Sequence, residues 1–83
     1  MMYPYMTLND GTEIATSEIL EDGRVKVCIE KPDATFGLKS MICWLPGYEI
    51  ENNYKFTDAE VEEYLKLIHK NAHVIMDLAR EGL

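Results

Sequence analysis

Two histidines and an aspartate are the residues whose spacing comes nearest to that of a metal site. His69 and His73 stand four residues apart, so on a helix their imidazoles share one face and can reach one ion. Asp77 continues the same ridge one turn later. The segment lacks the glutamate of the zinc-protease motif, and helical projection places it on the polar side. We therefore favour two surface histidines, and we keep a metal- or small-ligand-dependent enzyme using His69 and His73 as the alternative function.

The two cysteines are the next candidates for chemistry, because a thiol can act as a nucleophile. A nucleophilic thiol requires a nearby base and a positively charged setting. Cys28 stands between Val27 and Ile29, Cys43 lies in the most apolar run, and neither has a histidine close in sequence. They can in principle pair, but we predict two half-buried hydrophobic side chains. The sequence implies no catalytic residue and no cofactor. Two cysteines without a secretion signal indicate a cytoplasmic protein.

The charge balance argues against nucleic-acid binding. The 83 residues include 8 Lys and Arg but 15 Asp and Glu, which gives a formal charge of −7. Binding to phosphates needs clustered basic residues. Aromatic residues on a sheet can stack bases, so nucleic-acid binding through them is the hypothesis that we rank last. Core and interface roles are favoured instead for Tyr3, Tyr5, Trp44, Tyr48 and Tyr54. No apolar run approaches the roughly 20 residues that span a membrane.

The order of the hydrophobic patterns predicts an α+β domain covering residues 1–83, with strands first and one helix last. Asp-Gly pairs at 10–11 and 22–23 are strong hairpin signals, so the strands should form a three- or four-stranded antiparallel meander. The segments 31–34 and 47–55 look irregular. Strands are predicted at about 2–8, 12–20, 24–31 and 36–45.

A helix over about 58–81 should pack across this sheet. Thr57 and Glu60 have the spacing of a capping box at its start. Gly82 suits the left-handed position after its end, where Leu83 can contact Leu78. Apolar residues at helical spacing form a core stripe of Val61, Tyr64, Leu65, Ile68, Ala72, Ile75 and Ala79.

The register of the second hairpin depends on its loop. A three-residue loop with Gly23 in the left-handed conformation places Glu18 opposite Lys26, as a cross-strand pair of opposite charge. A two-residue loop would instead place Glu18 opposite Val27, on the apolar face. Since a shift of one residue turns every side chain to the other face, we predict the three-residue loop.

Apolar surface is left over once the helix covers the sheet. The run 41–45 is apolar on both faces, and the helix stripe is wider than one sheet requires. A core of this size gives only about 3–5 kcal/mol, so a homodimer would add useful buried area. The alternative is a monomer in which 47–55 folds over the spare surface. Candidate interface residues are Met6, Met41, Cys43, Leu45, Leu67, Val74 and Leu78.

Several short motifs along the chain resemble those of short bacterial proteins to which no reaction is assigned. They are Tyr3-Pro-Tyr-Met-Thr7, the Asp10-Gly-Thr12 turn, Leu45-Pro46 and Asn71-Ala-His73. The resemblance spans nearly the whole chain and implies a bacterial, cytoplasmic protein, but no site residues. These motifs are mainly turn and cap signals.

The predicted function is that of a small acidic protein-interaction module. Spare apolar surface favours binding of another protein, and a charge of −7 favours a basic partner. One concrete form is an antitoxin-like or inhibitor-like protein that covers a basic nucleic-acid-binding partner.

Overall fold

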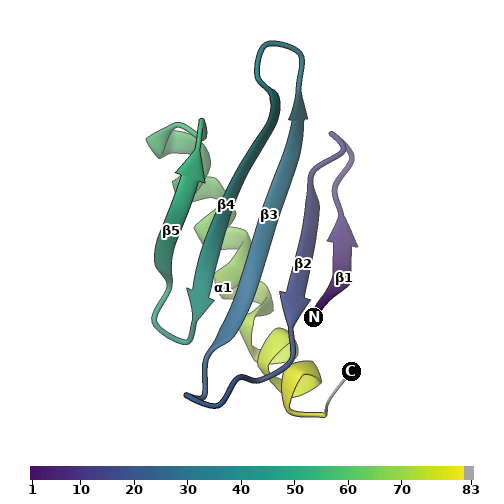
Figure 1. Cartoon of the computed structure of the whole chain (residues 1–83), viewed down its shortest axis with the longest axis vertical. Coiled ribbons are helices and arrows are strands. Elements are labelled where there is room, and N and C mark those ends of the chain that lie inside the picture. Colours follow the sequence, from purple (N-terminus) through teal and green to yellow (C-terminus); the bar gives the residue numbers. More distant parts are fainter. Residues whose placement is uncertain (82–83) are drawn as a thin grey trace.

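A five-stranded antiparallel meander followed by one long helix makes up the computed structural model, which describes residues 1–81 (Figure 1). The predicted α+β class and the order of its elements are confirmed. Each strand pairs with the next one in the chain, so β1 and β5 are the two edges. The elements are β1 (Met2–Thr7), β2 (Glu13–Ser17), β3 (Val25–Asp33), β4 (Gly37–Leu45), β5 (Glu49–Tyr54) and α1 (Asp58–Arg80).

Strand β5 forms in the segment 47–55 that the sequence suggested was irregular. It pairs with β4, so this segment extends the sheet at its edge and does not fold over a face as the monomer alternative supposed. Within the strand itself, Glu49–Tyr54, only Ile50 packs against the core, and the others are exposed. The strand therefore lacks an alternating hydrophobic pattern, and backbone pairing with β4 holds it in place.

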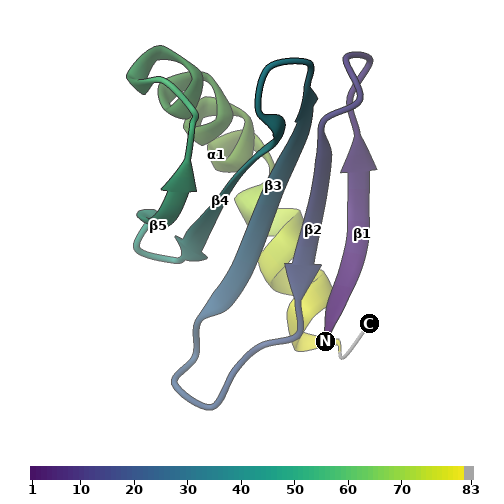
Figure 2. The same ribbon diagram turned by 45° about the horizontal axis from the view of Figure 1, so that its top comes forward.

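The helix covers one face of the sheet only. It begins beside β5 and runs diagonally to end near β1 and β2 (Figures 1 and 2). At its last turn the Ile19 amide donates a hydrogen bond to the Ala79 carbonyl across 3.3 Å. We call the face under the helix the covered face and the opposite one the open face. No element of the described chain lies over the open face (Figures 1 and 2).

Because successive side chains along a strand point to opposite faces, one set of apolar side chains faces the helix. From Val25 to Ile29 in β3 and from Met41 to Leu45 in β4, the odd-numbered side chains are buried and the even-numbered ones are half-buried, which is the period of a strand. From α1 the core receives Tyr64, Ile68, Ile75 and Ala79, and the predicted stripe is confirmed with its remaining members partly buried. The strand contribution is Ile14, Val25, Val27, Ile29, Met41, Cys43 and Leu45.

For three of the candidate interface residues the prediction is wrong. Met41, Cys43 and Leu45 are at most 2% exposed and lie beneath the helix, so no partner can reach them. The run 41–45 is apolar on both faces, and the sequence pattern does not say which face the helix takes. It takes the odd face, which leaves Ile42 and Trp44 on the open one.

The second hairpin has neither the predicted register nor that of the two-residue loop. Ile14 lies opposite Ile29 and Thr16 opposite Val27, one residue away from the expected pairing. The connection from β2 to β3 is longer than three residues, although Gly23 does take the left-handed conformation (φ +83°). This register is favourable because it buries the β-branched Ile14 and Thr16, where the predicted one would have buried Ala15.

The start of the helix follows the prediction. Glu60 N–H donates to Thr57 Oγ1 at 3.2 Å, and Thr57 N–H donates to Glu60 Oε1 at 3.0 Å, so the capping box is complete. The predicted cap at Gly82 and Leu83 lies outside the described residues. No helix within residues 1–81 has both the length and the hydrophobicity to cross a bilayer.

Candidate protein-binding surfaces

The structure does not gather the predicted metal ligands. His69 stacks on Tyr48 with ring centroids 3.9 Å apart and planes 5° from parallel. His73 Nε2 instead lies 3.3 Å from Asp77 Oδ2, on an exposed part of the helix. Within residues 1–81, no three His, Cys, Asp or Glu side chains are placed to hold one metal ion. The metal-dependent form of the enzyme alternative therefore has no assembled metal site within residues 1–81.

The two thiols lie on opposite faces of the sheet and have different surroundings. Cys28 is half-buried on the open face, Cys43 is fully buried on the covered face, and both are free. Burial raises the pKa of Cys43 to about 11 and also raises the pKa of Cys28. A raised pKa leaves the thiol protonated at neutral pH, which argues against a nucleophilic role for either.

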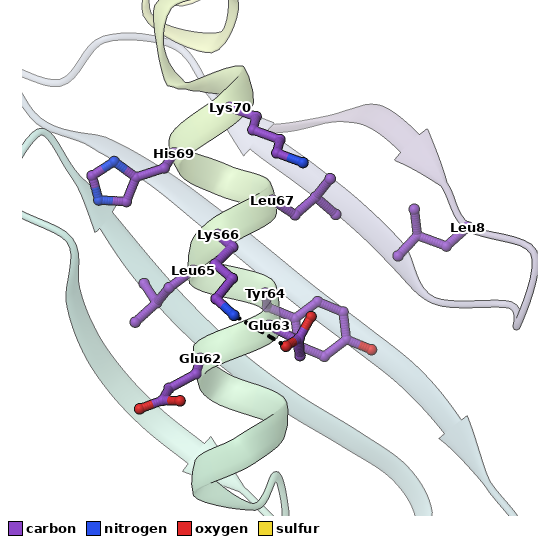
Figure 3. Close-up of a pocket in the computed structure, with 9 residues that line it drawn as sticks. All are labelled: Leu8, Glu62, Glu63, Tyr64, Leu65, Lys66, Leu67, His69 and Lys70. Carbon is purple, nitrogen blue, oxygen red and sulfur yellow. Dashed lines mark hydrogen bonds and ion pairs between the residues drawn. The ribbon is translucent and has the colours of Figure 1, made fainter.

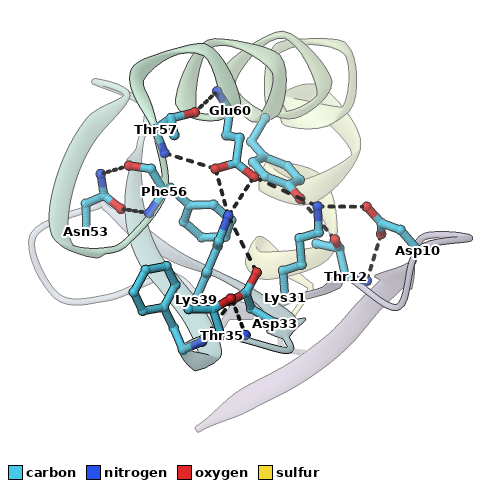
Figure 4. A network of polar contacts seen from close by, with 12 residues as sticks. Asp10, Thr12, Lys31, Asp33, Thr35, Lys39, Asn53, Phe56, Thr57 and Glu60 are labelled. Atoms are coloured by element: carbon cyan, nitrogen blue, oxygen red, sulfur yellow. Dashed lines mark hydrogen bonds and ion pairs between the residues drawn. The ribbon is translucent and has the colours of Figure 1, made fainter.

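The covered face ends in a network of ion pairs where the helix begins (Figure 4). Lys31 and Lys39 lie opposite one another on β3 and β4. Glu60 contacts both, at 3.8 Å from Lys31 Nζ and 3.1 Å from Lys39 Nζ. Lys31 also approaches Asp10 at 3.6 Å and Lys39 approaches Asp33 at 3.9 Å. Every charge in this network therefore has a partner of opposite sign.

Hydrogen bonds hold the three acids of this network in their ionised form. The side-chain hydrogen bond with Thr12 lowers the pKa of Asp10 below its ordinary value of 3.8. The backbone hydrogen bond from Phe36 does the same for Asp33. For Glu60 the backbone hydrogen bond from Thr57 lowers the pKa below 4.5, with help from Lys39. The network has a structural use, because it ties the helix start to the β3–β4 hairpin.

The open face has an apolar centre made by neighbouring strands. Ala15 of β2 lies opposite Cys28 of β3, which lies opposite Ile42 of β4, so the three side chains form a strip across the sheet. All three are half-buried, although nothing in the described chain covers them. Further along the same face, Leu38 is 42% and Tyr54 is 50% exposed. Apolar and aromatic side chains grouped in this way are typical of a contact surface.

One end of this strip carries the single tryptophan. Trp44 lies beside Lys26 on the open face, and the Arg24 guanidinium sits over its ring, 4.1 Å from the centroid. Its indole Nε1 is buried without a hydrogen-bond partner among the described residues. Tryptophan is the residue type most enriched at the energetic centres of protein interfaces.

Four glutamates surround the apolar strip. Glu13 and Glu30 lie directly opposite one another on β2 and β3, while Glu49 and Glu51 lie opposite Trp44 and Ile42. None of the four makes an ion pair with another residue of the described chain. Like charges facing each other across two strands are destabilising. The open face is therefore acidic around an apolar centre.

A second surface lies along the flank of the helix nearest β1. Leu67 and Leu78 are half-buried there, and Val74 is 48% exposed. These three candidate interface residues are therefore accessible at the surface. Leu8, at the end of β1, and Leu67 point toward one another (Figure 3). Both line a groove of about 930 Å³ along the first half of the helix. Met6, another candidate, packs partly against the core.

Most of the open face could not be predicted from the sequence. Its acidic rim includes Glu49 and Glu51, which belong to the strand that was not predicted. The even-numbered residues from Lys26 to Glu30 could have been recognised as one face, but the residues beside them depend on register. No family model, curated protein or solved structure matches this chain.

Proposed function

We propose that this protein is a small acidic protein-interaction module that binds a basic segment of a partner protein on its open face. The observation that carries the proposal is the apolar strip of Ala15, Cys28 and Ile42, left uncovered and surrounded by glutamates that have no ion-pair partner within residues 1–81. Arginine or lysine on the partner would supply the missing charge. Alternate apolar side chains of the partner would cover the strip.

Charge decides between a basic partner and a second copy on this face. Two open faces placed together would bring the glutamates of both copies into one interface, where like charges disfavour association. A basic partner gains from the same glutamates and also from the overall charge of −7, which speeds encounter. The open face therefore suits a partner of opposite charge.

An inhibitor-like or antitoxin-like role in the cytoplasm is the form of this function that we propose. Proteins that bind nucleic acids carry basic surfaces, and an acidic module that covers such a surface blocks it. The free thiols of Cys28 and Cys43 are in keeping with a reducing compartment. We assign no catalytic step to the protein.

A titration with a synthetic peptide of alternating arginine and leucine tests the proposal. Amide resonances of the protein, followed by NMR, should shift at Cys28, Ile42 and Glu51 on the open face. Affinity should fall as salt is added, because salt screens contacts between exposed charges. An acidic peptide of the same length should not bind.

Two charge reversals separate a local site from general attraction. Glu30→Lys changes the open face, while Glu62→Lys makes the same change of charge on the exposed side of the helix. We expect Glu30→Lys to weaken peptide binding about fivefold more than Glu62→Lys does. A fivefold change in affinity corresponds to the loss of about one contact between exposed charges. Equal weakening by both variants, or resonance shifts confined to the helix, would show that the open face is not the binding site.

A further inference from the structure

A regular ridge of four side chains runs along the helix flank nearest β1. Leu67, Asn71, Val74 and Leu78 follow one another at spacings of four, three and four residues. This is the spacing of the contact positions of a coiled coil. The ridge lies beside the core stripe: Val74 is 48% exposed, Asn71 and Leu78 are half-buried, and half-buried Leu67 also packs against the core.

We infer that this ridge is the contact between two copies of the chain, with their helices antiparallel. A two-fold axis between Asn71 and Val74 makes the ridge complementary to itself, as an interface with that symmetry requires. Leu67 then meets Leu78 of the second copy, and Leu78 meets Leu67. Each Val74 covers Asn71 of the other copy.

Charge complementarity selects the second copy and its direction. Lys70 and Asp77 are both exposed and border the ridge on its outer side. Antiparallel helices place Lys70 opposite Asp77 of the second copy, and the symmetry repeats this pair. Parallel helices would place Lys70 and Asp77 of the two copies on opposite sides of the contact, so this pair could not form. The same two residues therefore favour the antiparallel orientation.

The one polar residue of the ridge already has its hydrogen bonds. Asn71 accepts from the Tyr5 hydroxyl at 2.9 Å, and its Nδ2 donates to the Leu67 carbonyl at 2.8 Å. A second helix can therefore cover Asn71 without leaving its oxygen or its nitrogen without a partner, which would otherwise oppose burial. The contact with Tyr5 also fixes the ridge relative to β1.

This interface is independent of the proposed function. The helix lies on the covered face, so a dimer formed through its flank leaves both open faces free. Each dimer would then present two acidic surfaces. Variants of the ridge test association alone, and variants such as Glu30→Lys test partner binding alone.

Sedimentation equilibrium of the full chain over a wide concentration range measures this association. We expect a mass that rises from 9.6 kDa to twice that value. Val74→Glu should keep the protein monomeric, because it places a charge at the centre of the contact. Circular dichroism should show that the variant remains folded, since Val74 is exposed in the monomer.

Charge reversal provides a second readout that does not depend on the apolar contact. Lys70→Asp or Asp77→Lys alone should weaken the dimer roughly 5- to 30-fold, because each change disrupts two symmetric pairs. The double variant should restore the affinity. Lys66→Asp and Glu62→Lys are matched controls on the exposed helix surface and should leave it unchanged.

Three outcomes would overturn the inference. The first is a wild-type protein that stays at 9.6 kDa over the whole range. Another is a dimer that survives Val74→Glu, which would place the contact elsewhere. The last is a double variant no better than the single ones, which would exclude the antiparallel pairing of Lys70 with Asp77.

Discussion

The two faces of this sheet are built from the same strands, but their charged side chains differ in whether they have partners of opposite sign. On the covered face, Lys31 and Lys39 lie opposite one another and Glu60 bridges them, so the like charges are neutralised. On the open face, Glu13 and Glu30 also lie opposite one another, and no described residue neutralises them. One like-charge pair has been given a partner within the chain and the other has not.

This difference is why we propose the open face, and not the covered one, for binding. The covered face buries its apolar side chains and satisfies its charges, which is what stability requires. The open face leaves apolar side chains half-covered and carboxylates without partners. Features that a fold does not need are the ones that a binding partner can use, and the comparison can be tested with matched variants.

The largest expected effect comes from truncating one isoleucine on each face. Ile29→Ala should lower the free energy of unfolding by about 2–5 kcal/mol, because Ile29 is fully buried and its loss leaves a cavity. Ile42→Ala should lower it by less than about 1.5 kcal/mol, because half-buried Ile42 borders water. Urea denaturation measures both. Equal losses would mean that the open face is as much a part of the core as the covered one.

A smaller effect is expected from Glu60→Gln in the network of the covered face. At neutral pH it should lower the free energy of unfolding by about 1 kcal/mol, since it removes the ion pairs with Lys31 and Lys39. Folding lowers the pKa of Glu60 below 4.5. Its contribution is therefore complete above that pH and is lost as the pH falls through the lower folded value.

Thermal unfolding from pH 7 to pH 3 measures this dependence. The wild type and Glu60→Gln should converge as the solution becomes acidic, because protonated Glu60 resembles glutamine in charge. Two parallel curves that keep the same separation down to pH 3 would show that the charge of Glu60 does not stabilise the fold.

The smallest effect has the opposite sign and concerns the open face. Glu13→Lys should raise the free energy of unfolding by about 0.2–1 kcal/mol, because it turns a like-charge pair with Glu30 into an attractive one. Glu51→Lys makes the same change of charge opposite Ile42 and serves as the control. If Glu13→Lys gains nothing over this control, the two glutamates do not repel one another measurably.

Local signals predicted the elements well. The Asp-Gly turns, the alternation in 24–31 and the capping box of Thr57 and Glu60 each depend on residues close in sequence, and the structure has all three. The strand at 49–54 has no such local signal, because one residue of the segment, Ile50, packs against the core. It forms through backbone pairing with β4, which depends on a neighbour and not on its own side chains.

For the candidate sites too, spacing within one element did not show which residues of other elements lie beside it. His69 and His73 share a helix face as their spacing predicts, yet His69 stacks on Tyr48, a partner that spacing does not reveal. Helical periodicity did identify the flank of Leu67, Val74 and Leu78, because it depends on one element only. The glutamates of the open face come from three strands, and only the register brings them together.

The sequence by itself determined the class of fold, strands before one helix, and the start of that helix, since turn chemistry, strand period and caps are local. The tertiary structure alone decided which face of β4 is buried. A strand has two faces of equal period, both faces of 41–45 are apolar, and the choice belongs to the helix that covers one of them. That choice placed Met41 and Cys43 in the core and left Ile42 and Trp44 on the open face.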